Sequence, residues 1–216
     1  LVAIGEGQVH ILAAGAAAFL LAGCVATGKE LLAQSTKALD DAPVCCTTLA
    51  TARRQPLPAQ PVEVVVDHTA QAFDFGGSKA FFVLYELPAF RETYSIVLTS
   101  LAAGTLDDTA LLIPRVALYD RDFRVVRHFD EKTLRNRGNN LERTVFINPA
   151  NASERYIAIY GSDLSASMER AYSMVTVTPL VAGPVVMNMY SGSDGKSTLR
   201  SSPAGKLHIE VRGLAR

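Results

Sequence analysis

The sequence predicts a mostly β protein whose main domain is an antiparallel β-sandwich of the jelly-roll type. From Val62 onward, apolar and polar residues alternate with the period of two that marks a strand with one buried face. About ten such short runs follow one another, and residues that favour turns separate them. Because helical periodicity is nearly absent between the runs, we expect the strands to stack as two sheets.

The first segment of the chain has the pattern of an export signal. Residues 11–22 form an uncharged apolar run, shorter than the roughly 20 residues that a helix needs to cross a bilayer. Its length fits the apolar core of a signal peptide. The run leads into Leu21-Ala22-Gly23-Cys24, in which small residues give a peptidase access to the backbone and the thiol can accept lipid. We therefore predict a lipoprotein signal peptide at residues 1–23 and lipidation at Cys24.

A buried core helix with an incidental cysteine is the competing interpretation of this run. Residues 1–10 also contain Glu6 but no Lys or Arg, whereas export signals usually begin with positive charge. If Cys24 is modified, acyl chains such as palmitate hold the protein to a membrane that the chain does not cross. Val25 occupies the position where Asp favours inner-membrane retention, so we expect an outer-membrane anchor that faces the periplasm.

Residues 24–61 are expected to connect the anchor to the sandwich. Leucines scattered through the polar stretch up to Ala42 fit either a short amphipathic helix or a flexible tether. The connector that follows contains three prolines between Gln55 and Pro61, which disfavour regular strand pairing there. These features place the β-sandwich domain at residues 62–216.

The sandwich strands are expected where the alternation is continuous. The last of them is the clearest, because Leu207, Ile209 and Val211 alternate with polar residues. One helical window follows the cap-like pair Ser162-Asp163, at residues 164–171. The candidate strands are Val62–Val66, Ala80–Leu87, Tyr94–Ser100, Arg115–Tyr119, Phe123–His128, Arg143–Asn148, Arg155–Tyr160, Ser173–Thr178, Val185–Tyr190 and Lys206–Arg212.

Two adjacent cysteines, Cys45 and Cys46, stand between the anchor and the sandwich. If Cys24 carries lipid, these two of the 3 cysteines remain to pair with each other. Thiols seldom persist in an oxidising periplasm, and adjacent cysteines can form a vicinal disulfide. A pair of small buried apolar side chains is the other interpretation. A catalytic cysteine is disfavoured, because no His lies in the local sequence context.

Charge and histidine spacing argue against nucleic-acid and metal ligands. The 21 Lys and Arg balance the 21 Asp and Glu, and no basic stripe exists that would bind nucleic acid. The histidines after Cys24 are His68, His128 and His208, and none has the close spacing to another ligand residue that a metal site requires. We expect His128 and His208 to be solvated, and we predict no metal and no cofactor.

The sequence motifs that would indicate an enzyme are incomplete or missing. Gly195-Lys196-Ser197 resembles the end of a phosphate-binding loop, but Tyr190 stands where that motif needs its first Gly. No Gly-x-Ser-x-Gly elbow occurs. Asp120 and Asp122 could bind a cation or act as an acid/base pair, but Asp in a strand–turn–strand context favours a turn. We predict no catalytic residues; a hydrolase would require carboxylates clustered in a cleft.

Six segments, taken in order, resemble a known family. They include a strand that ends in Pro88, a Leu-Thr-Ser strand, a Pro-x-Val-x-Leu-x-Asp strand and an aromatic strand that begins at Arg155. In these patterns the chain resembles the maltose operon periplasmic protein family, from about Pro43 to Val211. The segments are Ala42–Leu49, Phe82–Pro88, Tyr94–Ser100, Ile113–Asp120, Glu142–Ile147 and Arg155–Gly161.

The resemblance implies a non-catalytic periplasmic protein that is accessory to carbohydrate transport. Such a protein would bind either a maltodextrin or a partner such as a porin or a binding protein. The absence of Trp favours a protein partner, whereas the tyrosines keep sugar stacking open. The alternative is a structural or assembly lipoprotein of the cell envelope whose sandwich is a protein-interaction module without sugar. The tyrosines concerned are Tyr85, Tyr94, Tyr119, Tyr156 and Tyr160.

Overall fold

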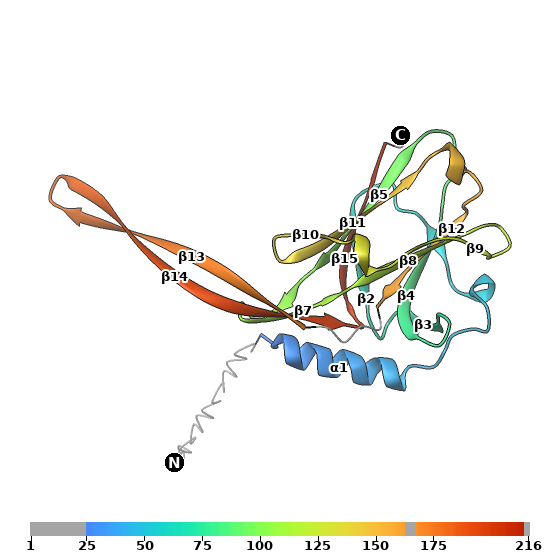
Figure 1. Cartoon of the computed structure of the whole chain (residues 1–216), viewed down its shortest axis with the longest axis horizontal. Coiled ribbons are helices and arrows are strands. Elements are labelled where there is room, and N and C mark those ends of the chain that lie inside the picture. Colours follow the sequence, from blue (N-terminus) through green and yellow to red (C-terminus); the bar gives the residue numbers. More distant parts are fainter. Residues whose placement is uncertain (1–24, 163–166, 214–216) are drawn as a thin grey trace, which may run out of the picture.

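The computed structural model describes residues 25–162 and 167–213, and the chain is mostly β, as predicted. Two sheets face each other as a sandwich, and a third sheet carries a long hairpin that projects from the body (Figure 1). Helix α1 (Gly28–Asp41) lies at the end of the body from which the hairpin departs (Figure 1). Cys24 and the predicted signal peptide lie outside the described residues.

The two large sheets contain most of the predicted strands. The 6-stranded sheet consists, in spatial order, of β1 (Gln55–Pro56), β4 (Lys79–Glu86), β12 (Tyr156–Gly161), β8 (Pro114–Tyr119) and β9 (Val125–Phe129), with β3 (Gln71–Asp74) also paired to β4. The 5-stranded sheet consists of β10 (Arg135–Arg137), β11 (Asn140–Ile147), β5 (Tyr94–Leu101), β15 (Gly205–Arg212) and β2 (Val62–Val66).

Pairing within these two sheets is antiparallel except at one edge. There Gln55 and Pro56 of β1 pair parallel with Tyr85 and Glu86, so the expectation that prolines prevent pairing in this connector was wrong. Pro56 is tolerated because it lies on the outermost strand, and the next amide, Leu57 N, still donates to Glu86 O at 3.0 Å.

The main core fills the space between the two sheets. Val116, Leu118 and Ile157 point into it from the 6-stranded sheet, and Ile96 and Leu207 point into it from the 5-stranded sheet. All of these side chains are fully buried. Burial of this apolar surface is what the period-two pattern encodes, and it fixes the register of each strand.

The outer face of the 6-stranded sheet is apolar as well. Because Val116 and Leu118 point inward, Ala117 and Tyr119 point outward, into a second apolar cluster. Leu49, in the 3₁₀ helix η1 (Leu49–Thr51), packs over part of this face. Strands with two apolar faces read as nearly continuous apolar runs, which is why β4, β8 and β12 hide the alternation that β15 displays.

Helix α1 forms, although its sequence fitted a tether equally well. Thr27 and Glu30 build a capping box at its start, which satisfies amides that would otherwise lack partners. At its end, Lys79 Nζ donates to the carbonyl oxygens of Asp40 and Ala42, each at 3.0 Å. Since Lys29 N, at the start of the helix, also donates to Asp108 Oδ2 at 3.0 Å, the helix is held to the body at both ends.

The hairpin was predicted as two short sandwich strands, Ser173–Thr178 and Val185–Tyr190. Instead, β13 (Ser167–Ala182) and β14 (Val185–Ser202) pair along their length, and only the end of β14 joins the body. That end pairs with β7 (Asp108–Leu112), which in turn pairs with β6 (Ala103–Gly104).

The helix expected at residues 164–171 was wrong in the part that the structure describes. Residues 167–171 belong to β13, where they pair with residues 196–200 of β14. Ladder pairing here outweighs the local preference for helix, which is worth only tenths of a kcal/mol per residue, about 0.7 at most. Two further 3₁₀ helices, η2 (Glu131–Thr133) and η3 (Pro149–Asn151), occupy connections of the body.

Candidate functional site

A groove with aromatic walls lies on the outer face of the 6-stranded sheet. It encloses about 620 Å³ and is lined from β8, β9 and β12, from the turn after β3 and from the start of η1. Its principal side chains are Phe73, Phe75, Tyr119, Phe123, His128 and Tyr160. We refer to it below as the aromatic groove.

The floor of the aromatic groove is a small residue, Ala117, at a position set by strand register. Ala117 on β8 pairs with Ala158 on β12 and with His128 on β9. Ala117 points outward, because Val116 and Leu118 are buried in the main core, whereas Ala158 beside it is fully buried and does not line the groove. The rows on either side carry large rings, Tyr160 on one and Tyr119 on the other. The small side chain of Ala117 therefore lies at the bottom of a hollow between larger ones.

Stacked pairs of rings hold the walls. Phe75 stacks on Tyr160 with ring centroids 3.8 Å apart and an interplanar angle of 4°. On the other side, Phe123 stacks on Tyr156 at 4.2 Å and 11°. The Arg54 guanidinium lies over the Tyr156 ring, 5.6 Å from its centroid. Each such pair adds about 1 kcal/mol beyond burial, so the walls are fixed before any ligand arrives.

Polar groups lie at the rim of the groove. His128 Nε2 is 3.0 Å from the Tyr160 hydroxyl, and the His128 side chain is exposed. Asp122 is also exposed and pairs with Arg124 at 3.4 Å. Burial raises the pKa of Tyr119, so its hydroxyl remains a hydrogen-bond donor throughout the physiological range. The groove thus combines apolar walls with a few hydrogen-bonding groups, the composition typical of small-molecule sites.

Phe123 is placed by a strained turn. Its φ is +58°, a left-handed conformation that side chains with a Cβ rarely adopt. Asp120 stabilises this turn, since its Oδ1 accepts from the amides of Asp122 and Arg124, each at 2.9 Å. The turn interpretation of Asp120 therefore fits the geometry. Strain held in place by surrounding contacts is often associated with functional sites, and here it positions a ring over the groove.

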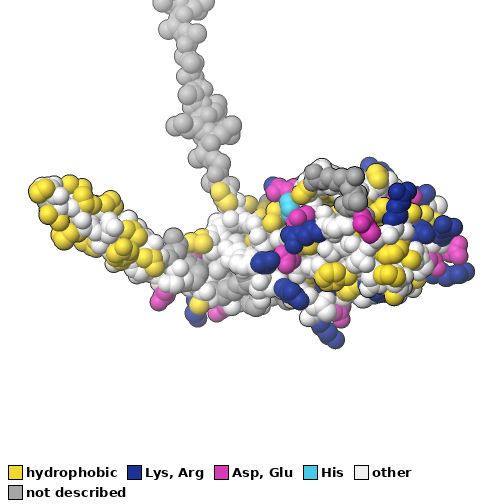
Figure 2. Space-filling view, turned by 90° about the horizontal axis from the view of Figure 1, so that it is seen from above, with side chains coloured by type: hydrophobic (Ala, Val, Ile, Leu, Met, Phe, Trp, Pro, Cys, Tyr) yellow, Lys and Arg dark blue, Asp and Glu magenta, His cyan; other side chains and the backbone are white. Residues whose placement is uncertain are grey.

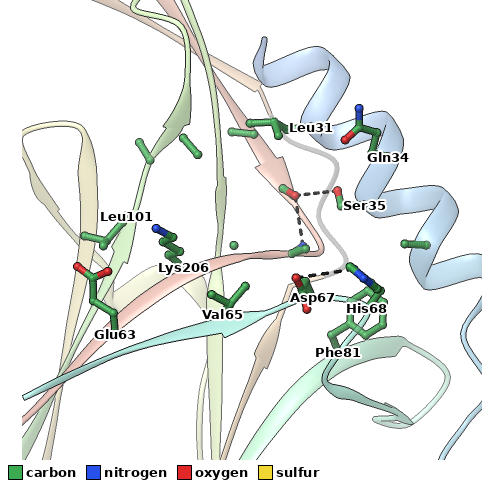
Figure 3. Close-up of a pocket in the computed structure, with 17 residues that line it drawn as sticks. Leu31, Gln34, Ser35, Glu63, Val65, Asp67, His68, Phe81, Leu101 and Lys206 are labelled. Atoms are coloured by element: carbon green, nitrogen blue, oxygen red, sulfur yellow. Dashed lines mark hydrogen bonds and ion pairs between the residues drawn. The ribbon is translucent and has the colours of Figure 1, made fainter. Parts of the chain in front are cut away.

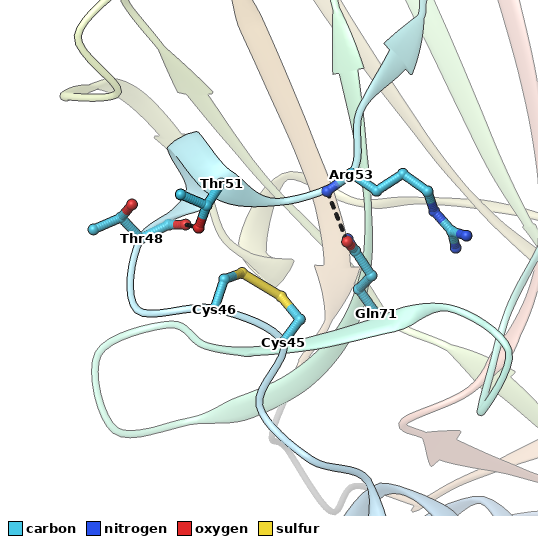
Figure 4. The surroundings of a disulfide bond; sticks show 6 residues. All are labelled: Cys45, Cys46, Thr48, Thr51, Arg53 and Gln71. Carbon is cyan, nitrogen blue, oxygen red and sulfur yellow. Dashed lines mark hydrogen bonds between the residues drawn. A yellow bond between two sulfur atoms is a disulfide. The ribbon is translucent and has the colours of Figure 1, made fainter.

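Cys45 and Cys46 lie beside the loop that leads into η1, and a disulfide joins them (Figure 4). Cys45 is exposed and its amide donates to Ala72 O at 2.8 Å, while Cys46 packs against the outer apolar cluster. Exposure of Cys45 does not fit a pair of buried apolar side chains. Close by, Gln71 Oε1 accepts from Arg53 N at 2.7 Å, which fastens the segment just after η1 to β3 (Figure 4).

The predicted stacking tyrosines separate into two groups. Tyr119, Tyr156 and Tyr160 gather at the aromatic groove, whereas Tyr85 and Tyr94 are buried in the main core. Sequence reasoning missed the groove's phenylalanines: Phe73 lies on β3, and Phe75 and Phe123 lie in turns far apart in the chain. It also left His128 as a solvated residue; the side chain is exposed but bonds to the groove wall.

A second hollow, of about 530 Å³, lies beneath α1 (Figure 3). The Ser35 and Ser202 hydroxyls are 2.9 Å apart and connect the helix to the end of β14. His68 and Asp67 face each other across 3.7 Å. Gln34, Glu63 and Lys206 also line the hollow (Figure 3). The rest of its lining is mostly Ala, Val and Leu with a single Phe, so it lacks the stacked aromatic walls of the aromatic groove.

The residues that the structure describes contain neither a cluster of metal ligands nor a membrane-spanning helix. In residues 25–162 and 167–213, no three His, Cys, Asp or Glu side chains come together as a metal site would require. No helix within those ranges combines the length and apolarity needed to cross a bilayer.

No protein-family model, curated protein or solved structure matches the chain.

Proposed function

We propose that the chain is a non-catalytic periplasmic lipoprotein that serves carbohydrate transport by binding maltodextrin in the aromatic groove. The observation that carries this proposal is the pair of preformed aromatic walls on either side of Ala117. The C–H faces of a sugar ring pack well against such rings, while its hydroxyl groups need partners such as His128 and Asp122 at the rim. The sequence resemblance to the maltose operon family supports the same class of ligand.

The location is part of the proposal. Lipidation of Cys24 after removal of residues 1–23 would hold the body at the periplasmic face of the outer membrane. Helix α1 begins at Gly28, shortly after that cysteine, so little free chain would separate the body from the membrane. Membrane attachment then comes from lipid and requires no spanning segment.

Calorimetric titration with maltodextrins of increasing length tests sugar binding. We expect saturable heat that grows with chain length until the groove is filled. Phe75→Ala should weaken binding about tenfold, because it removes one stacked wall. Phe146→Ala, which truncates an exposed ring on β11 away from the groove, is the matched control and should bind as wild type does.

Absence of heat at millimolar sugar would contradict the proposal. Two functions would then remain: an accessory protein of carbohydrate transport that binds a porin or a binding protein, or a structural or assembly lipoprotein of the cell envelope whose sandwich is a protein-interaction module. Crosslinking in intact cells, with the probe placed at Asp122 on the groove rim, would identify that partner.

A further inference from the structure

The tip of the outer half of the β13–β14 hairpin, residues 180–187, is apolar on both faces. Cross-strand partners share a face in an antiparallel ladder, so Val181 and Val186 lie on one face and Leu180 and Met187 on the other. Val181 is 72% exposed and Val186 is 63% exposed. Strands in a soluble sheet usually bury one face and present a polar one. This arm presents apolar side chains in both directions.

Charge is missing from the same half. No Asp, Glu, Lys, Arg or His occurs between Arg170 and Asp194. The Glu169–Lys196 ion pair, 3.6 Å, lies toward the base of the arm. Figure 2 shows yellow side chains at the end of the hairpin, while blue and magenta side chains gather over the body. Exposed strands usually carry charges that prevent association, so an uncharged apolar arm marks an interaction surface.

The base of the hairpin lies where the N-terminal segment enters the fold. Asp108 contacts both elements, since Oδ1 accepts from Arg200 Nε on β14 at 2.7 Å and Oδ2 accepts from Lys29 N on α1 at 3.0 Å. Gly28 also lies so close to Thr109 that a Cβ would come within 2.5 Å of its carbonyl carbon. A membrane that holds the lipid of Cys24 would therefore lie close to the base of this hairpin, from which the tip projects (Figure 1).

We infer that the hairpin tip, residues 180–187, inserts into the interface of a lipid bilayer as a second point of attachment. A bilayer surrounds both faces of the tip at once, whereas a single protein surface covers one face. Insertion of amphipathic elements reaches about 5–10 Å, which corresponds to about three residues on each strand at roughly 3.4 Å per residue. The inference uses the proposed anchor at Cys24 for position and is independent of sugar binding.

The backbone fits shallow insertion and limits its depth. The outer edges of a two-stranded hairpin have unpaired N–H and C=O groups, which hydrocarbon cannot satisfy. Pro179 and Pro184 have no N–H, so the tip carries fewer such donors than an ordinary hairpin. Tyr190 lies farther from the turn and is exposed, at the level where aromatic side chains favour the headgroup region.

A single tryptophan can report the depth of the tip, because the chain contains no Trp. Val186→Trp places the probe at the tip, and Phe146→Trp places it at an exposed position of the body. Each variant, processed to begin at lipidated Cys24, is mixed with vesicles of phosphatidylethanolamine and phosphatidylglycerol that contain brominated acyl chains. The N-terminal segment is the same in both variants, so the difference in quenching reports the hairpin. We expect a blue shift and strong quenching for Val186→Trp only.

A second variant separates insertion from anchoring. Adding Val181→Asp to Val186→Trp places a charge beside the probe at a position that is already exposed, so folding should be unaffected. We expect partition of the tip to fall about fivefold, while flotation of the protein with vesicles through its N-terminus persists.

Three results would overturn the inference. In the first, Val186→Trp floats with vesicles and yet is quenched no more than Phe146→Trp. In the second, the protein does not float at all, which would also overturn the proposed anchor. The third is a blue shift without lipid, together with a doubled mass by light scattering, which would assign the tip to a second copy of the chain. Sugar binding, measured separately by calorimetry, is unaffected by any of them.

Discussion

The two apolar surfaces of this molecule, the aromatic groove and the hairpin tip, differ in how their side chains are held. In the groove each wall ring rests on another, Phe75 on Tyr160 and Phe123 on Tyr156. At the tip, Val181 has a cross-strand neighbour but remains exposed. Preformed walls suit a ligand of defined shape, because few side chains have to become ordered when the ligand binds. An exposed arm suits a fluid surface such as lipid, which demands no shape complementarity.

The largest expected difference between body and arm is in stability. Leu118→Ala removes a side chain that is 0% exposed between the two large sheets, and it should lower the free energy of unfolding by about 2–5 kcal/mol. Val186→Ala, on the arm, should change it by less than about 0.5 kcal/mol. Urea unfolding followed by circular dichroism measures both. Equal losses would mean that the hairpin is part of the cooperative core.

Alkaline pH should distinguish the same two regions. Burial raises the pKa of Tyr94 to about 12, and its hydroxyl, buried in the main core, has no hydrogen-bond partner among the described residues. As pH rises, the Tyr94 hydroxyl loses its proton in the unfolded chain before it does so in the folded chain. The free energy of unfolding is therefore retained below pH 10 and falls as pH rises through 10 to 12. At pH 11 this loss is about 1 kcal/mol.

Tyr94→Phe should therefore reduce the difference in urea midpoint between pH 8 and pH 11. It should not destabilise the protein at pH 8, because the hydroxyl makes no bond within the described structure. Some alkaline loss remains, since burial also raises the pKa of Tyr119. Tyr190→Phe on the hairpin is the control and should leave both midpoints unchanged. An unaltered alkaline loss in Tyr94→Phe would contradict the assignment.

Sequence patterns predicted the sandwich strands well because those strands have a face to bury. Val62–Val66 matches β2, and the clear alternation near the C-terminus matches β15. The same reasoning gave a wrong prediction for the hairpin. Alternation indicates which residues share a face, but it does not indicate whether a second sheet covers that face. Residues 173–178 and 185–190 therefore looked like sandwich strands, although their apolar side chains lie outside the body.

The aromatic groove was only partly predictable for a related reason. Three of its tyrosines stood out as rings that a sugar could use, but the floor depends on register. Ala117 comes to lie between the rows of Tyr119 and Tyr160 only through the pairing of β8 with β12, which no local pattern encodes. Phe75 lies in a turn, where apolar residues carry no periodic signal. Phe123 was assigned to the start of a strand, but β9 begins only at Val125.

The smallest expected effect concerns the backbone that places Phe123 over the groove. The hairpin turn uses Gly183 for its left-handed residue, with φ of +61°, whereas the groove turn uses Phe123 at +58°. A Cβ in that conformation costs roughly 1 kcal/mol, and Gly avoids the cost. Phe123→Gly and Phe123→Ala both remove the ring, so their difference isolates the backbone. We expect the Gly variant to be more stable by about 1 kcal/mol in urea unfolding.

Phe146 lies within strand β11, so the opposite order is expected there. Phe146→Gly should be less stable than Phe146→Ala by about 0.5–1 kcal/mol. The same order of stability at both positions would mean that the Phe123 turn is unstrained. With opposite orders, the calorimetric titration completes the comparison. If both Phe123 variants lose maltodextrin binding while the Gly variant is more stable than the Ala variant, the backbone strain serves to position the ring. The hairpin turn avoids this cost in free energy, because its apolar side chains need no fixed orientation.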